Sequence, residues 1–193
     1  VWGQLLDHDM SLTQESKVEA YNIEVPRGDR FFDPFNTGTA EITLTRSAFA
    51  EGTGTEAGNP RLQINTLTSH LDSSNVYGST PAIEKLLRGE GGKLLTSEGD
   101  LMPIGTGDRG VEFKAGDSRS NENAALTSIH TLFVREHNFW VDQLSANFPK
   151  MDANELYNNA RVIVEGIMQN ITFNEFLPLL LGPDALTSYQ GYD

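Results

Sequence analysis

Cysteine is absent from this 193-residue chain, and its absence excludes several kinds of site at once. No disulfide, iron–sulfur cluster, cysteine zinc site or thiolate-ligated haem can form within it. Basic residues are also few, because 14 lysines and arginines stand against 27 aspartates and glutamates, for a net charge of -13. This charge repels nucleic acid and anionic lipid, so we expect neither as a partner. It suits a cation such as calcium, although a solvated acidic surface is the simpler interpretation.

Long apolar runs are missing as well. The longest, residues 176–181, is short and contains Pro178, whereas a membrane span needs about 20 apolar residues. No basic and apolar signal peptide opens the chain, which begins in the middle of a helical pattern. We therefore expect an excerpt of a longer protein that has no membrane span in this part.

Helical patterns predict a mainly α fold. They cover residues 1–9, about 81–88, 122–147 and 152–181. A capping box of Asp152 and Glu155 begins the last helix, and Gly182 with Pro183 ends it. The sequence thus predicts one partial helical domain over residues 1–193, with long loops and little β structure.

The remaining segments are rich in glycine, proline and polar residues. We expect a short strand at residues 41–45, a loop over residues 68–79, and a hairpin around residues 94–104 within a Gly-rich stretch. Loops this long are uncommon unless they bind something.

Residues 2–9 read WGQLLDHD and carry the first candidate site. Gln4, Asp7 and His8 share one helical face, while Asp9 points about 100° away. Taken alone, a histidine beside a carboxylate at a helix end is more typical of a solvated cap. The whole string, however, resembles the distal-haem segment of the animal-type haem peroxidases, the myeloperoxidase and peroxidasin family. The resemblance implies that His8 is the distal acid–base histidine, Gln4 its pocket neighbour, Asp7 a carboxylate esterified to the haem, and Asp9 a calcium ligand.

Residues 68–74, TSHLDSS, place oxygen-bearing residues at every second position. In an extended loop the alternation puts Thr68, His70, Asp72 and Ser74 on one side, and calcium takes six to eight oxygen ligands. An ordinary polar loop is the simpler interpretation without the family. The following residues 75–79, NVYGS, also resemble the family, which implies a calcium site that includes Asp9 and only the backbone carbonyl of His70.

Residues 115–122, AGDSRSNE, lead into a helix that again resembles the family through residues 134–138, VREHN. The resemblance implies that Arg119 is the distal arginine and Glu122 the second haem-ester carboxylate. A surface pair of Arg119 and Glu122 is the alternative from spacing alone. Asn123 stands where some members carry a methionine with a third haem link. His130 and His137 match no ligand of the family, so we expect them to pack in the core.

The resemblance runs to residues 177–183, LPLLLGP, and implies a haem peroxidase with haem b held by ester bonds, calcium, and an extracellular location. It implies hydrogen peroxide as the oxidant and halides, pseudohalides or small organic molecules as donors. The proximal histidine of the family has no counterpart here, so the chain by itself is not expected to be active. Lack of cysteine favours a bacterial member. A cyclooxygenase-like fatty-acid dioxygenase and a non-catalytic, calcium-stabilised adhesion module remain alternatives.

Overall fold

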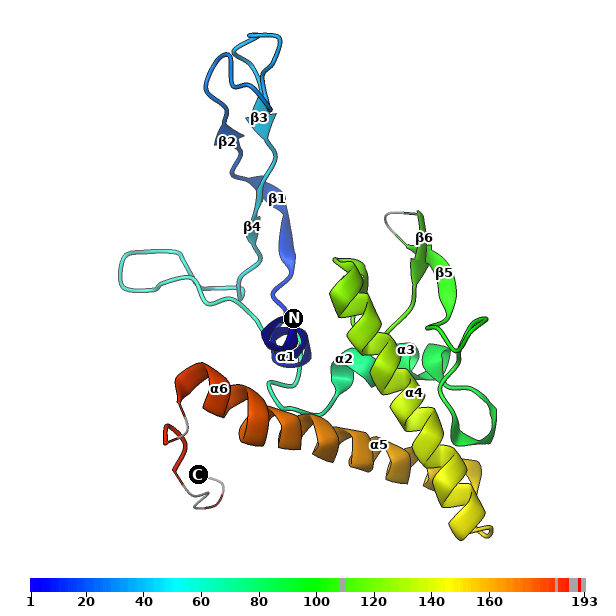
Figure 1. The fold of residues 1–193 in the computed structure, drawn as a ribbon. Helices are drawn as coiled ribbons and strands as arrows, with labels where there is room; N and C mark the ends of the chain where they lie inside the picture. The colour runs from blue at the N-terminus through cyan, green and yellow to red at the C-terminus, as the bar shows by residue number, and fades with distance from the viewer. Residues whose placement is uncertain (108–109, 183, 188–190, 192–193) are drawn as a thin grey trace. The chain divides into compact units, whose positions relative to one another are not determined.

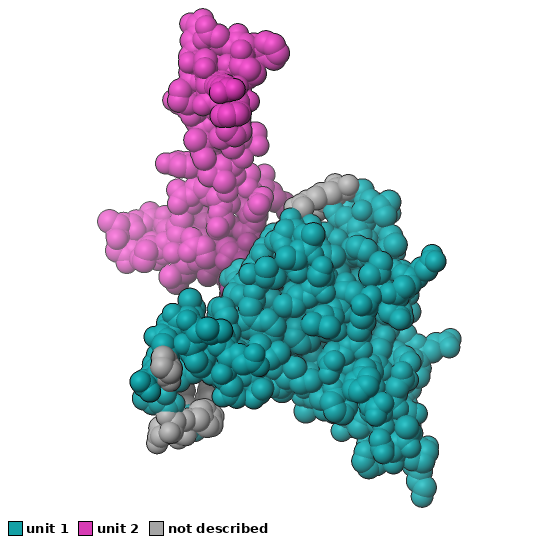
Figure 2. Space-filling model, in the orientation of Figure 1, with its two compact units in different colours: residues 1–10, 67–193 teal, residues 11–66 magenta. Residues whose placement is uncertain are grey.

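The computed structural model describes residues 1–107, 110–182, 184–187 and 191 (Figure 1). The chain forms two compact units, one of residues 1–10 and 67–193 and the other of residues 11–66 (Figure 2). Helices dominate the first unit, so the mainly α fold class is confirmed. The extent of the domain, residues 1–193, stays a prediction.

Four helices of the first unit lie where the sequence patterns predict them. They are α1 (Trp2–Met10), α3 (Pro81–Leu87), α4 (Ala124–Asn147) and α5 (Ala153–Ile171). Helix α5 begins with the predicted capping box, because Asp152 accepts from the backbone of Glu155 while the Glu155 side chain accepts from the backbone of Asp152. Short 3-10 turns at Glu90–Gly92 (η1) and Ser118–Asn121 (η2) precede and follow the glycine-rich loops.

The predicted helix over residues 152–181 is not uniform. A π-helical segment, η3 (Thr172–Phe176), separates α5 from α6 (Leu177–Leu181). Pro178 lies in the first turn of α6, and a proline ring collides with the carbonyl four residues earlier in a regular α-helix. The wider π turn just before it accommodates the ring. Gly182 ends α6 with φ 101°, as expected of a terminating glycine, while Pro183 lies outside the described residues.

Two expectations about the loops are wrong. The segment 68–79 contains a short helix, α2 (Ser74–Tyr77), in place of a continuous loop. The hairpin of this unit is formed by β5 (Ile104–Gly107) and β6 (Gly110–Phe113), and not by residues 94–104. Glycines interrupt the apolar alternation of β5 and β6, so the sequence hides the strands. Residues 94–104 carry only the isolated bridges Arg88–Leu94 and Ser97–Leu101.

The core of the first unit joins α1, α2, α4 and α5. Its fully buried members include Leu5, Tyr77, Leu126 and Val164. His130 and His137 are fully buried on α4, which confirms that they pack in the core. His137 lies 3.0 Å from both the Tyr77 hydroxyl and the carbonyl of Gly92, so its ring nitrogens are satisfied.

The second unit contains two small antiparallel sheets of two strands each. Strand β1 (Glu15–Ala20) pairs with β4 (Thr45–Ser47), and β2 (Ile23–Glu24) pairs with β3 (Glu41–Ile42). The predicted strand at 41–45 is therefore split in two. The break falls at Leu44, whose carbonyl accepts from the backbone of Tyr21 and whose N–H donates to the side chain of Asn22.

Candidate functional site

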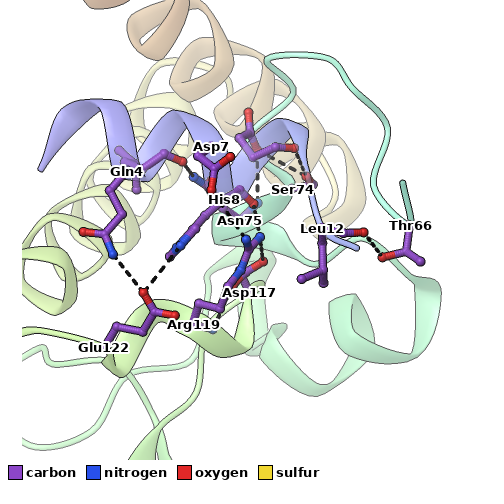
Figure 3. Close-up of polar contacts among 12 residues, drawn as sticks. Gln4, Asp7, His8, Leu12, Thr66, Ser74, Asn75, Asp117, Arg119 and Glu122 are labelled. Atoms are coloured by element: carbon purple, nitrogen blue, oxygen red, sulfur yellow. Dashed lines mark hydrogen bonds and ion pairs between the residues drawn. The ribbon is translucent and has the colours of Figure 1, made fainter. Parts of the chain in front are cut away.

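Helix α1 carries polar side chains on two flanks. Figure 3 shows the first, where Gln4 and His8 both contact Glu122. His8 and Asp9 are both buried, although they are neighbours in the sequence. His8 turns toward residues at the start of α4, and Asp9 turns toward the start of α2. The 100° rotation per residue of an α-helix separates the two.

The His8 flank begins with Glu122. Gln4 Nε2 donates to Glu122 Oε2 at 2.8 Å, and His8 Nε2 lies 3.7 Å from the same oxygen. Asn123 Nδ2 donates to Gln4 Oε1 at 3.0 Å, which holds the amide of Gln4 at both ends. Asn123 is also the N-cap of α4, where it accepts from the backbone of Leu126. The N-terminus of α4 thus fixes the polar groups opposite His8.

Arg119 is held by a buried carboxylate. Its Nε and one terminal nitrogen donate to the two oxygens of Asp117 at 2.9 and 2.8 Å, a paired geometry that fixes the guanidinium plane. Asp117 is also the N-cap of η2 and accepts from the backbone N–H of Arg119. The guanidinium reaches the His8 carbonyl at 3.5 Å and the Asp7 carboxylate at 3.7 Å. Gln4, Asp7, His8, Arg119 and Glu122 therefore belong to one connected cluster.

The surroundings of His8 keep its imidazole neutral. Burial lowers the pKa of His8, and the positive charge of Arg119 lowers it further. The carboxylates of Asp117, Glu122 and Asp7 act in the opposite direction but do not reverse the shift. A neutral imidazole at physiological pH has one unprotonated nitrogen that can accept a proton.

The Asp9 flank is enclosed by the start of α2. The Asp9 carboxylate accepts from the backbone N–H groups of Ser73 and Asn75 at 3.1 Å, and from the Ser74 hydroxyl at 3.2 Å. These donors are all neutral. Burial raises the pKa of Asp9 to about 6, and the nearby charge of Asp72 contributes to the rise. A buried carboxylate with neutral donors and a second carboxylate nearby is an environment that a cation would stabilise.

The loop before α2 differs from the extended strand-like segment that the alternation suggested. Ser69 and Ser73 have positive φ values of 62° and 58°, so the chain turns twice. The structure brings Asp72 and Ser74 together with Asp9, and Asp72 Oδ1 accepts from the backbone of Ser74 at 3.1 Å. Thr68 and His70 are exposed, and the His70 ring bonds the Thr68 carbonyl at 2.8 Å.

A cation at this place would depend on more than carboxylates. Across the described residues, no group of three or more histidine, aspartate or glutamate side chains is arranged to hold a metal. Calcium also takes hydroxyl and backbone carbonyl oxygens, and of the predicted ligands of this kind the Ser74 hydroxyl lies 3.2 Å from the Asp9 carboxylate. The oxygens of Asp9, Asp72 and Ser74 are hard donors, a type that suits calcium better than a transition metal.

Three residues of the site were given no role by the sequence analysis. Asp117 clamps Arg119, Asn123 positions Gln4, and Asn75 ties α2 to α1 through its bond to the Leu5 carbonyl at 2.9 Å. Asp117 and Asn123 carry a recognisable signal, since each has the residue type of an N-cap directly before a helical turn. Asn75 carries none, because its role depends on how two distant helices meet.

Comparison with known proteins agrees with this geometry. The family model of the animal haem peroxidases matches residues 1–193. Thyroid peroxidase of Canis lupus familiaris is 33% identical over the whole chain, which spans 25% of that protein. Peroxinectin A of Dictyostelium discoideum is 32% identical, and the chain spans 40% of it. This chain belongs to the animal haem peroxidase family.

Solved structures give the same fold. Peroxidase A from Dictyostelium discoideum superposes with a TM-score of 0.83 at 29% identity, over all of this chain and 41% of that one. A fatty acid alpha-dioxygenase from Arabidopsis thaliana superposes with a TM-score of 0.72 at 21% identity, over 93% of this chain and 27% of that one. The second likeness shows a shared fold alone. Among the described residues, no helix combines the length and apolarity that crossing a membrane requires.

Proposed function

We propose that this chain is the distal part of a haem peroxidase that reduces hydrogen peroxide and oxidises halides, pseudohalides or small organic donors. The observation that carries the proposal is the joining of Gln4, His8 and Arg119 in one cluster, with a buried and neutral imidazole at its centre. Family membership supports it. An extracellular setting, which the family resemblance implies, belongs to the same proposal.

His8 is the acid–base residue in this proposal. Its Nε2 atom, on the side of Glu122, takes a proton from hydrogen peroxide and returns it to the oxygen that leaves when the O–O bond breaks. A low pKa is required for the first half of this task, because an imidazolium has no free nitrogen. Burial and the charge of Arg119 both act in that direction.

Arg119 stabilises the charge that develops during bond breaking. A guanidinium remains protonated, and its fixed position means that little reorganisation is needed when the charge appears. Asp117 supplies this fixation through two short bonds, so we assign it a positioning role. Gln4, held by Asn123 and Glu122, completes the polar surroundings of His8.

Asp7 and Glu122 are the residues we propose to hold the haem through ester bonds. Their side chains are 58% and 37% exposed, so both carboxylates are accessible to a cofactor, and both adjoin the His8 cluster. When bound, a haem would supply the redox chemistry of its iron. Asn123 has no sulfur, so it cannot form a third, sulfonium link.

Asp9, Asp72 and Ser74, with Thr68 and the backbone of His70, are the residues we propose as calcium ligands. The buried carboxylate of Asp9 and the proximity of Asp72 support this choice. Calcium would neutralise both charges and tie α1 to the loop before α2. Thorough chelation of the full-length protein should then lower its melting temperature; an unchanged melting temperature after calcium removal would exclude the site.

The acid–base role is tested with His8→Ala in the full-length, haem-loaded enzyme. Stopped-flow mixing with peroxide, followed at the Soret band, should show the first step slowed by about 10²-fold or more. Oxidation of a phenol or halide in the later steps should change far less, which makes the same trace its own control. Added imidazole should restore part of the first step. An unchanged first step would show that His8 has only a structural role.

A further inference from the structure

A groove of about 730 Å³ runs between α4 and the β5–β6 hairpin of the first unit (Figure 1). Its floor is formed by one face of α4, on which the lining residues recur at intervals of three and four; they are Ala124, Thr127, Ser128, Thr131 and Arg135. Its wall is one face of the hairpin. A volume of this size is typical of a site for a small organic ligand.

The hairpin wall that faces α4 is apolar. Val111 and Phe113 alternate with Glu112 along β6, so Val111 and Phe113 lie on one face of the strand and Glu112 on the other. Ile104 is paired with Phe113 and shares its face. Glu112 also borders the groove, but a Cβ added to Gly107 would meet its carboxylate, which therefore lies over the glycine on the other face of the hairpin.

The neutral polar side chains of the groove are already engaged within the protein. The hydroxyls of Thr127, Ser128 and Thr131 donate to backbone carbonyls at 2.8, 2.7 and 2.9 Å. Because a hydroxyl has a single proton, none of the three has one left for a ligand. The side-chain amides of Asn121 and Asn123 bond the backbone of β6 and the side chain of Gln4 on α1. The groove therefore offers a ligand few neutral donors.

Arg135 is the exception among the lining residues. Its Nε donates to the Asp100 carbonyl at 2.8 Å and its Nη2 to the Gly99 carbonyl at 2.9 Å, so the guanidinium is held in a fixed position. In the described part of the chain these partners are neutral carbonyls, which do not cancel its charge. A guanidinium has further N–H groups for a bound acid. An apolar groove with a fixed cation at one end suits an organic anion.

The other end of the groove reaches the cluster around His8. Asn123 lines the groove, and its Nδ2 donates to Gln4 Oε1 at 3.0 Å. Gln4 in turn donates to the oxygen of Glu122 that lies 3.7 Å from His8 Nε2. From Asn123 to Arg135 the helix rises about 18 Å. A molecule whose acid group lies on Arg135 therefore extends toward the proposed site of reaction.

We propose that this groove binds phenols that carry a carboxylate, and that these are the organic donors of the enzyme. The carboxylate lies on the guanidinium of Arg135, and the aromatic ring packs between α4 and Phe113, with its hydroxyl toward Asn123. Each phenol gives up one electron and one proton, so two phenols convert one hydrogen peroxide into two waters and leave two phenoxyl radicals. The inference rests on the proposed peroxidase function and names the class of its organic donor.

Equilibrium binding to the full-length, haem-loaded enzyme, measured by calorimetry without peroxide, tests the proposal. The probes are p-coumarate and its uncharged methyl ester, which share the phenol and differ in the acid group. We expect wild type to bind p-coumarate about 10-fold or more tighter than the ester, because only the acid forms charge-assisted hydrogen bonds with Arg135.

Arg135→Gln should remove this preference and leave the affinity for the ester within about threefold of wild type. Lys93→Gln is the control, since Lys93 is a cation outside the groove that pairs with Asp142 at 2.7 Å, and it should keep the full preference. Equal affinities for acid and ester in wild type, or a preference that survives in Arg135→Gln, would overturn the proposal.

Ser128→Phe provides a second variant that leaves Arg135 and its turn in place. Ser128 is exposed on the floor of the groove, so a phenyl ring there fills the space and should weaken both probes by about 10-fold or more. Wild-type affinities in Ser128→Phe would show that the probes bind elsewhere and would refute the inference. An enzyme that binds p-coumarate as expected but fails to react with peroxide would instead refute the proposed function, because binding is measured without peroxide.

Discussion

The two flanks of α1 differ in how accessible their carboxylates are to solvent. On the His8 flank, the contacts of His8 and Arg119 with Glu122 and Asp7 are 3.7 Å long, and both of these carboxylates are accessible to solvent. On the other flank, the Asp9 carboxylate is fully buried and accepts three hydrogen bonds from neutral donors at 3.1–3.2 Å.

In the proposed function, the accessible flank takes part in the reaction and the buried flank fixes the position of the helix. The exposed carboxylates of Asp7 and Glu122 are accessible to a cofactor, and their 3.7 Å contacts with Arg119 and His8 cost little to replace. The three hydrogen bonds that the Asp9 carboxylate accepts hold this end of α1 in place, and with it the neighbouring residue His8. A change in the position of Asp9 is therefore expected to move His8, because the two residues share a peptide bond.

The largest expected effect concerns Arg119. Arg119→Ala in the full-length enzyme should slow the peroxide step by about 10²- to 10³-fold, the usual range for the loss of one charge-stabilising donor. In the double variant with His8→Ala the two losses should be less than additive, since both residues act on one bond-breaking event. Stopped-flow rates of the two single variants and the double variant provide the comparison. Full additivity would mean that the two residues act independently.

A stability effect is expected on the other flank. Asp9→Ala removes the acceptor of two buried backbone N–H groups, those of Ser73 and Asn75, and should lower the free energy of unfolding by about 3 kcal/mol or more. Asp7→Ala, two residues earlier and exposed, is the matched control and should change stability by less than about 1 kcal/mol. Urea unfolding of the full-length protein measures both. Equal losses in the free energy of unfolding would mean that the two flanks contribute equally to stability.

Acid should destabilise the core behind both flanks. Burial lowers the pKa of His137 to about 4, and the charges of Arg88 and Arg161 add to the shift, while the neighbouring Tyr77 stays uncharged. Between pH 6.5 and 4 the unfolded chain therefore binds a proton at His137 that the folded chain does not. The contribution of His137 to the free energy of unfolding is complete above pH 6.5 and is lost as the pH falls. The loss from this residue is about 2 kcal/mol between pH 7 and pH 5. His137→Leu should flatten the pH dependence of unfolding by that amount, and an unaltered slope would contradict the assignment.

The smallest change concerns how firmly the cofactor is retained. Asp7→Val and Glu122→Gln in the full-length enzyme should each release more haem into acidic organic solvent than wild type does, because each removes one proposed ester. The double variant should release nearly all of it. Wild-type protein that releases all of its haem under these conditions would show that neither ester exists.

Much of the site could be predicted because its chemistry is concentrated in short sequence strings. The helices α1, α4 and α5 have clear periodicity and caps, and residues 2–9 and 115–122 carry the resemblance to the family. The β5–β6 hairpin was missed because its glycines hide the alternation of strands. The loop before α2 was misjudged because the positive φ values of Ser69 and Ser73 are set by the surrounding contacts and not by residue type. Asn75 gains its importance only where α2 meets α1, through its bond to the Leu5 carbonyl.

The division of labour between His8 and Asp9 is tested most directly by measuring calcium content and the peroxide step on the same two variants of the full-length enzyme. His8→Ala should keep the wild-type calcium content and lose about 10²-fold or more in the peroxide step. Asp9→Asn should lose calcium, while its folded, haem-loaded molecules lose less of the peroxide step than His8→Ala does. A His8→Ala enzyme with a wild-type peroxide step, or an Asp9→Asn enzyme with full calcium content, would contradict the account.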